Sequence, residues 1–363
     1  MTPVDTAVLA RLARQSADLI VSLQDPSGAY PASPTFSAYK GYSWFRDGAF
    51  IADGVSSMGE ADSASAFFDW CARVLEDRAD QIDRIVAAAA AGTPVADSEM
   101  LATRFTFDGR DGADEWWDYQ LDGYGTWLWA VVEHASRHGL SLDRWQRGIE
   151  LSVAYLRSSW QRPCFDWWEE HSEAVHGSTL GCIAGGFLAV QKAGLADLSD
   201  DIAAIRALML AEGTHDGHLT KWLGSQEIDA SLASVVYPLS VFGPDTAVGT
   251  ATIVAIDSQL AVDNGVHRFL ADTFFGGGQW PLLSCMLGIA YAGAGNNERA
   301  RELLDWASTQ FTAEGFLPEQ VGEHLLDPSM EAEWIERWGT VATPLLWSHA
   351  MFARLAVQLG VTA

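Results

Sequence analysis

Two short segments of the chain each place a glutamate where it could act as a catalytic acid or base. Glu169 and Glu170 follow directly after two tryptophans, and apolar surroundings of this kind can raise the pKa of a carboxyl group and keep it protonated. Glu319 follows Pro318, which stiffens the turn that carries it. Hydrolysis of a glycosidic bond requires one protonated carboxyl and one ionised carboxylate on opposite sides of the anomeric carbon. These glutamates are therefore candidates for such a pair.

Other ionisable side chains are alternatives for the same roles. Glu170 could replace Glu169 as the acid. Four further glutamates could replace Glu319 as the base, although their polar surroundings favour a surface loop: Glu323, Glu331, Glu333 and Glu336. Three histidines could carry out acid–base chemistry of the kind that sugar epimerases perform on a ring of helices: His171, His176 and His349. A protein that only binds sugar is a third possibility, but it would not need a paired acid and base.

Tryptophan is unusually frequent, with 16 among 363 residues. Many tryptophans stand beside Asp, Glu or Gly in breaks between apolar segments, namely Trp44, Trp116, Trp117, Trp167, Trp168, Trp280, Trp338 and Trp347. An indole stacks on the apolar C–H face of a sugar ring while carboxylates and amides bind its hydroxyl groups. Core packing explains many single tryptophans, but this combination favours a small carbohydrate ligand.

The chain is strongly acidic, with 48 Asp and Glu against 22 Lys and Arg and a formal net charge of −26. Such a surface repels phosphate backbones and anionic lipids. The charge therefore argues against nucleic acid and membrane surfaces as partners. It leaves a neutral ligand as the better expectation.

Cysteine usage and the N-terminal segment indicate the compartment. The four cysteines are scattered without a C-x-x-C pair, which predicts reduced, mostly buried thiols and no zinc site. The apolar residues of 8–23 follow the spacing of a helix face and do not form the continuous core of a signal peptide. No apolar run is long enough to cross a bilayer. We therefore expect a cytoplasmic protein that needs neither metal nor cofactor.

The elements that must bring these residues together are helices. Apolar residues recur at three-to-four spacing over the ranges 8–23, 63–75, 126–137, 143–158, 178–192, 202–210, 229–239, 250–262, 281–293, 298–310 and 344–359. Strand-like alternation is scarce, and its best candidate is 103–107. No linker divides the chain, which favours one domain over residues 1–363. Consecutive helices joined by short loops pack antiparallel, and about a dozen could close into a ring.

Six motifs follow one another along the chain. They are W-x-R-D at Trp44, Arg46 and Asp47; a tryptophan and Q-x-D-G at Trp116, Gln120, Asp122 and Gly123; W-E-E at Trp168, Glu169 and Glu170; G-x-x-R-x-x-x-D at Gly265, Arg268 and Asp272, followed by GGGQW ending at Trp280; E-Q at Glu319 and Gln320; and L-x-W-S at Leu345, Trp347 and Ser348. In this order, and spread over nearly the whole chain, they resemble the motifs of the glucoamylase group, glycoside hydrolase family 15.

The resemblance implies an all-α (α/α)6 barrel and an inverting, exo-acting α-glucoside hydrolase without a metal. It implies that Glu169 is the general acid and Glu319 the general base. It also implies that the substrate is bound by Trp44, Arg46, Asp47, Trp116, Trp168, Glu170, Arg268 and Trp347. Among these, the charged residues would bind hydroxyl groups, and the tryptophans would form aromatic walls.

Some assignments remain open at this stage. Gln120 and Asp122 could contact sugar or only hold a loop in place. Lys40 stands where fungal members of the family have a tyrosine that stabilises developing charge. We expect short substrates with an isomaltose-type α-1,6 bond, ahead of α-1,4 maltosides and trehalose. The segments 85–104 and 323–341 are expected to shape the site of the second sugar.

Overall fold

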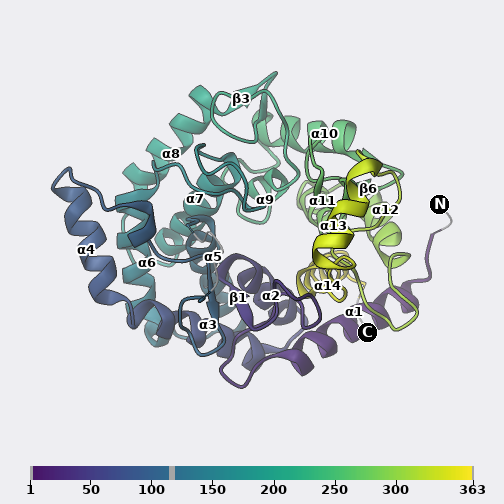
Figure 1. Ribbon diagram of the computed structural model, residues 1–363, viewed down its shortest axis with the longest axis horizontal. Helices are drawn as coiled ribbons and strands as arrows, with labels where there is room; N and C mark the ends of the chain where they lie inside the picture. The colour runs from purple at the N-terminus through teal and green to yellow at the C-terminus, as the bar shows by residue number, and fades with distance from the viewer. Residues whose placement is uncertain (1–2, 114–118, 362–363) are drawn as a thin grey trace.

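Six helices are buried over most of their length and stand next to one another in a closed ring (Figure 1). They are α2 (Phe45–Ser57), α5 (Asp122–His138), α7 (Gly177–Lys192), α9 (Leu232–Val236), α11 (Pro281–Gly293) and α14 (Leu346–Gln358). Each contacts the next one, and α14 contacts α2, so the ring closes. This computed structural model describes residues 3–113 and 119–361.

A second ring of helices surrounds the first (Figure 1). It consists of α1 (Thr6–Leu23), α3 (Ala61–Glu76), α6 (Gln146–Ser159), α8 (Ser199–Glu212), α10 (Ala247–Leu260) and α12 (Asn297–Ser308). These helices bury one face against the inner ring and expose the other, as in α3, where Phe67, Phe68 and Leu75 are buried. Outer and inner helices alternate along the chain and form six helical hairpins. The described part of the protein is therefore an (α/α)6 barrel, which confirms the predicted fold class.

All eleven predicted helical stretches coincide with observed helices, but three helices were missed. The apolar spacing predicts no helix between residues 23 and 63, and this is wrong, because α2 begins at Phe45. Nearly every residue of α2 is buried, so no polar face marks it in the sequence. The other two, α4 (Ala79–Ala90) and α13 (Glu331–Trp338), lie on the surface; α4 buries two residues and α13 buries none.

Short antiparallel strand pairs connect some of the helices. The pair of β1 (Tyr42–Trp44) and β2 (Arg104–Thr106) confirms the strand predicted at 103–107. This pairing places Trp44 opposite Arg104, directly before α2 begins. Two further pairs are formed by β3 (Thr214–His215) with β4 (His218–Leu219), and by β5 (Ala261–Val262) with β6 (Gly265–Val266).

Close helix packing depends on glycine where α5 meets α7. A Cβ atom on Gly125 would lie 2.5 Å from the carbonyl oxygen of Cys182, and one on Gly186 would lie 2.4 Å from the carbonyl oxygen of Gly125. Two inner helices can therefore approach backbone to backbone at this position. The four cysteines are all buried and unpaired, as predicted. Within the described residues, no helix has both the length and the apolar character needed to span a bilayer.

Candidate active site

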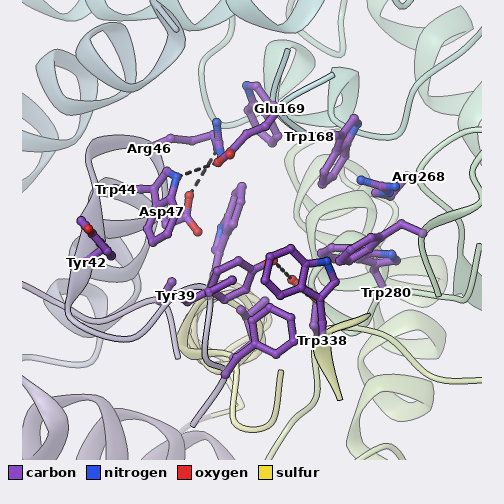
Figure 2. A pocket seen from close by; sticks show the side chains of 18 of the residues that line it. Tyr39, Tyr42, Trp44, Arg46, Asp47, Trp168, Glu169, Arg268, Trp280 and Trp338 are labelled. Carbon is purple, nitrogen blue, oxygen red and sulfur yellow. Dashed lines mark hydrogen bonds and ion pairs between the residues drawn. The ribbon is translucent and has the colours of Figure 1, made fainter. Parts of the chain in front are cut away.

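A cavity of about 820 Å³ opens at the end of the barrel where the inner helices begin. Nine of the predicted site residues line it: Trp44, Arg46, Asp47, Trp168, Glu169, Glu170, Arg268, Glu319 and Trp347. They come from segments that precede or begin α2, α7, α11 and α14. The tenth, Trp116, lies outside the described residues. The closed ring thus brings together residues that the sequence scatters over most of its length (Figure 2).

Glu169 lies in a tight turn that is held by Asp166. The Asp166 carboxylate accepts the backbone N–H groups of Trp168 and Glu170 at 2.9 Å each. Between these two, Glu169 has a positive φ of 64°, which a residue other than glycine rarely adopts without support from its surroundings. The Glu169 carboxylate accepts the indole N–H of Trp44 at 2.7 Å (Figure 2). The turn therefore directs this carboxylate toward Trp44 and the cavity.

Glu319 is almost completely buried, with 2% of its surface exposed. Its Oε1 accepts a hydrogen bond from the Tyr39 hydroxyl at 2.9 Å, while its Oε2 has no hydrogen-bond partner among the described residues. Its backbone N–H donates to the carbonyl of Ala342 at 2.9 Å. The Ser348 hydroxyl donates to the carbonyl of Pro318, also at 2.9 Å. The carboxylate is thus held through one oxygen, while the other is buried without a hydrogen-bond partner among the described residues.

Burial raises the pKa of Glu319 from its ordinary value of 4.5 to about 7, against the lowering effects of the Tyr39 hydrogen bond and the Arg268 charge. Above neutral pH this carboxyl is therefore ionised and can take up a proton. The sequence had indicated a raised pKa at Glu169, because of its tryptophan neighbours. In the structure the pKa of Glu319 is raised, which the sequence did not indicate, because the turn after Pro318 is buried in the cavity wall.

Arg46 is anchored from the beginning of α5. Its Nη1 donates to Gln120 Oε1 at 2.6 Å and to Asp122 Oδ2 at 3.0 Å, and its Nε lies 3.3 Å from Asp47 Oδ2. Burial raises the pKa of Asp47, although the Arg46 charge opposes this. Among the described residues, Gln120 and Asp122 are fully buried and do not line the cavity. They hold Arg46 in position, which favours a structural role for Gln120 and Asp122 over direct contact with the sugar.

Arg268 connects the W-E-E turn with the loop before α11. Its Nε donates to Asp272 Oδ2 at 2.8 Å, and its Nη2 bonds both to Asp272 Oδ1 and, at 3.3 Å, to Glu170 Oε1. Burial raises the pKa of Glu170, with Arg268 acting against it. Both glutamates therefore lie near an arginine: Glu170 is paired with Arg268, and the charge of Glu169 acts on Arg46 and raises its pKa.

Aromatic rings surround these charged groups. Trp347 stacks on Phe50 with ring centroids 5.3 Å apart. The Trp168 ring lies 5.4 Å from that of Trp280, and the Arg268 guanidinium lies 5.1 Å from the Trp168 ring. Such rings can stack on the apolar faces of a sugar.

The short helix α13 supplies cavity residues that the sequence analysis did not identify individually. Trp334, Arg337 and Trp338 line the cavity. That the segment 323–341 shapes the site of the second sugar stays a prediction, but the segment does contribute to the cavity wall. The segment 85–104 does not, because none of the described lining residues belongs to it. That part of the prediction is wrong: the segment contains the end of α4, which lies at the edge of the barrel (Figure 1).

Residues 8–270 of the chain match the protein family described as "Glycosyl hydrolases family 15". The chain is a glycoside hydrolase of family 15. It is 53% identical over 370 residues to isomaltose glucohydrolase of Kribbella flavida, across 99% of this chain and 96% of that protein. A solved single-residue variant of a glycosidase in complex with glucose is 52% identical, with a TM-score of 0.96, covering 99% of this chain and 98% of that one. Glucoamylase from Saccharomycopsis fibuligera is 14% identical, with a TM-score of 0.74 and coverage of 99% and 97%; this likeness concerns the fold.

In this family 15 hydrolase, the residue beside Glu319 is Tyr39 and not Lys40. Lys40 is exposed, whereas the Tyr39 hydroxyl bonds to Glu319. The correspondence of Lys40 to the family's tyrosine stays a prediction, but a tyrosine hydroxyl is present in this cavity, on Tyr39. The sequence did contain the signal, since Tyr39 is the neighbouring residue, but only the hydrogen bond distinguishes the two.

No histidine is among the described residues that line the cavity of the hydrolase. His349 bonds to the Leu317 N–H and the Ser16 hydroxyl, and burial lowers its pKa to about 3. His176 bonds to the carbonyl groups of Cys164 and His171. Structural roles account for both buried histidines. The alternative bases also lie away from the described cavity wall: Glu323, Glu331, Glu333 and Glu336. The described residues include no group of three or more His, Cys, Asp or Glu that could hold a metal ion.

Proposed function

We propose that this chain removes glucose from the non-reducing end of short α-glucosides with inversion, and that an isomaltose-type α-1,6 bond is its preferred substrate. The observation that carries the proposal is the meeting of Glu169 and Glu319 in one cavity, each held by an aromatic hydrogen-bond donor. Glu169 acts as the general acid and Glu319 as the general base.

In this reaction Glu169 protonates the glycosidic oxygen while the C–O bond breaks. Glu319 takes a proton from a water molecule that attacks the anomeric carbon from the opposite side, and β-glucose is released. Its Oε2, which no described residue engages, is the oxygen available for that proton. Arg46, Asp47 and Arg268 bind the hydroxyl groups of the glucose, since charge-assisted hydrogen bonds hold such groups firmly.

The preference for an α-1,6 bond is supported by the 53% identity to isomaltose glucohydrolase over nearly all of both chains. A cytoplasmic location belongs to the same proposal and is supported by four buried cysteines that form no disulfide. In that compartment, disaccharides and short oligosaccharides are the accessible substrates.

Proton NMR of the reaction with isomaltose, maltose and trehalose tests the substrate and the stereochemistry together. We expect β-glucose to appear before mutarotation, fastest from isomaltose. The leaving sugar is itself glucose and keeps its own anomeric configuration, so the stereochemistry is read from the excess over this background. An initial excess of newly formed α-glucose would contradict inversion. Rapid cleavage of maltose without cleavage of isomaltose would contradict the linkage preference.

The roles of the two glutamates can be separated by the leaving group. Fluoride departs without a proton, so Glu169→Gln should lose at least about 100-fold in kcat on isomaltose while retaining much of its activity on α-glucosyl fluoride. Glu319→Gln should lose activity on both substrates, because both require an activated water. The reverse pattern would exchange the two assignments.

A further inference from the structure

Lys221 is a buried cation that lies behind the W-E-E turn and does not belong to the described cavity wall. Its Nζ donates to Asp166 Oδ2 at 2.9 Å and to Asp229 Oδ2 at 2.7 Å. Only 2% of its side chain is exposed, and the two carboxylates are each 3% exposed. Its ammonium group also lies 3.6 Å from the centroid of the Phe269 ring. A buried group of three charges is weak evidence for stability, because desolvation offsets much of the attraction.

The two carboxylates that Lys221 joins hold different parts of the same turn. Asp166 Oδ1 accepts the backbone N–H groups of Trp168 and Glu170, on either side of Glu169. Asp229 Oδ2 accepts the indole N–H of Trp168 at 2.9 Å. The backbone of the turn and its tryptophan side chain are therefore both connected to one ammonium group.

The turn needs such support because of the conformation of Glu169. A positive φ at a non-glycine residue persists only where other contacts enforce it. Burial by itself would raise the pKa of Asp166, but the Lys221 charge, together with His176 and the hydrogen bonds that Asp166 accepts, outweighs burial and lowers the pKa. Asp166 thus stays ionised as a strong acceptor for the two N–H groups. Without the ammonium, two neighbouring buried carboxylates would be left without their cation.

We propose that Lys221 is a positioning residue for the general acid. It acts through Asp166 and Asp229, which together set the place of the Glu169 carboxyl against the leaving oxygen. This inference rests on the proposed role of Glu169 as the acid. A displacement of a catalytic group by about 1 Å can cost about 100-fold in rate.

The test is Lys221→Met, which keeps most of the length of the side chain and removes its charge. We expect kcat on isomaltose to fall by about 100-fold, with KM changed by less than about threefold, because the sugar-binding arginines keep their partners. On α-glucosyl fluoride, whose leaving group needs no proton, kcat should fall by less than about threefold. Equal losses on both substrates, or no loss in a folded variant, would overturn the inference.

Two further variants keep the test decisive. If Lys221→Met does not fold, the double variant Lys221→Met, Asp229→Asn takes its place, since it keeps the net charge of the group; the same kinetic outcomes then decide. Arg354→Met removes another cation, one that bonds to the buried Asp53 at the opposite end of the inner helices. This control should lose stability without the difference between the two substrates.

Glu169→Gln, measured in parallel, separates the inference from the proposed function. If that variant fails to show the difference between isomaltose and the fluoride, the assignment of the acid is wrong and the inference falls with it. If Glu169→Gln shows the difference and the Lys221 variants do not, only the inference is overturned.

Discussion

The indole of Trp44 and the phenol of Tyr39 meet edge to face, with 5.5 Å between their ring centroids, and each donates a hydrogen bond to a different glutamate. Trp44 donates to Glu169 at 2.7 Å (Figure 2), and Tyr39 donates to Glu319 at 2.9 Å. Two carboxyl groups that lie far apart in the sequence are therefore positioned by one short segment. The relative placement of the proposed acid and the proposed base is therefore connected through this pair of rings.

Replacing Tyr39 by phenylalanine should shift the pH dependence of the reaction. The hydroxyl of Tyr39 lowers the pKa of Glu319, which burial raises to about 7. Without this hydrogen bond the pKa rises further, and the base is ionised only at higher pH. We expect the acidic limb of the kcat/KM profile to move up by about one pH unit, so that activity falls more at pH 6 than at pH 8.

Tyr42→Phe is the matched control, because Tyr42 lines the same cavity and makes no hydrogen bond to either glutamate through its hydroxyl. Its acidic limb should stay where it is in the unchanged enzyme. An unshifted limb in Tyr39→Phe would show that the hydroxyl does not stabilise the ionised base.

The outer helices could be predicted because one face of each is buried and the other is solvated. In α3, for example, Phe67 and Leu75 are buried while Glu76 at its end is exposed. The inner helix α2 lacks this alternation, since nearly all of its residues are buried, including Arg46 and Asp53. Such a helix gives only a weak amphipathic pattern, although the other five inner helices were predicted despite being mostly buried as well.

The motifs indicated the two glutamates and the two arginines that line one cavity, because each motif is local in sequence. Contacts between distant residues left no such pattern. Lys221 reaches Asp166 across 55 positions, and nothing in its flanking residues marks it. The choice between Lys40 and Tyr39 likewise depended on which side chain the turn before β1 directs to Glu319, and this is set by tertiary packing.

Arg337 on α13 should affect only substrates that carry a second sugar. Its side chain lines the cavity between Trp334 and Trp338 and has no hydrogen bond or ion pair with any described residue. We therefore expect Arg337→Met to raise KM for isomaltose by about tenfold, corresponding to about 1.4 kcal/mol for a lost hydrogen bond to a charged group. Its kcat should change little.

The control for Arg337→Met is a substrate without a second sugar. KM for α-glucosyl fluoride should be the same in the variant and the unchanged enzyme. A parallel rise in both KM values would place Arg337 near the first glucose and contradict its assignment to the second. Because no residue of α13 is buried, the substitution should not affect folding.

Gly125→Ala should destabilise the barrel where α5 packs against α7. The added Cβ would lie 2.5 Å from the carbonyl oxygen of Cys182 and 2.7 Å from the backbone nitrogen of Ile183. Alanine normally stabilises a helix relative to glycine, but backbone atoms cannot move aside as a flexible side chain can. We expect a loss of at least about 2 kcal/mol in the free energy of unfolding, measured by chemical denaturation.

Gly322→Ala provides the comparison for this prediction. The nearest atom to its added Cβ is Glu331 Oε1 at 3.7 Å, and its φ is not in the left-handed region. The free energy of unfolding should change by less than about 0.5 kcal/mol. Similar free energies of unfolding for the two alanine variants would mean that α5 and α7 can move apart without a loss of stability.

The stability of Glu319→Gln relative to the unchanged protein should increase as the pH rises, although the substitution removes the proposed base. In the folded protein the pKa of Glu319 is about 7, above its ordinary value of 4.5, so folding favours the protonated form. The stabilising effect of that raised pKa is complete below about pH 4.5 and is lost as the pH rises to about 7. At about 1.4 kcal/mol per pH unit, the loss in the unchanged protein amounts to about 3 kcal/mol.

A glutamine stays neutral throughout and can still accept the Tyr39 hydrogen bond through its amide oxygen. The difference in free energy of unfolding between Glu319→Gln and the unchanged protein should therefore grow in favour of the variant from pH 4.5 to pH 7 and remain constant above it. Denaturation at pH 5 and pH 8 measures this, with Glu323→Gln as an exposed control in the following loop. A constant difference would mean that Glu319 ionises in the folded protein as easily as in the unfolded chain, and that the enzyme gives up no stability to keep a charged base in its cavity.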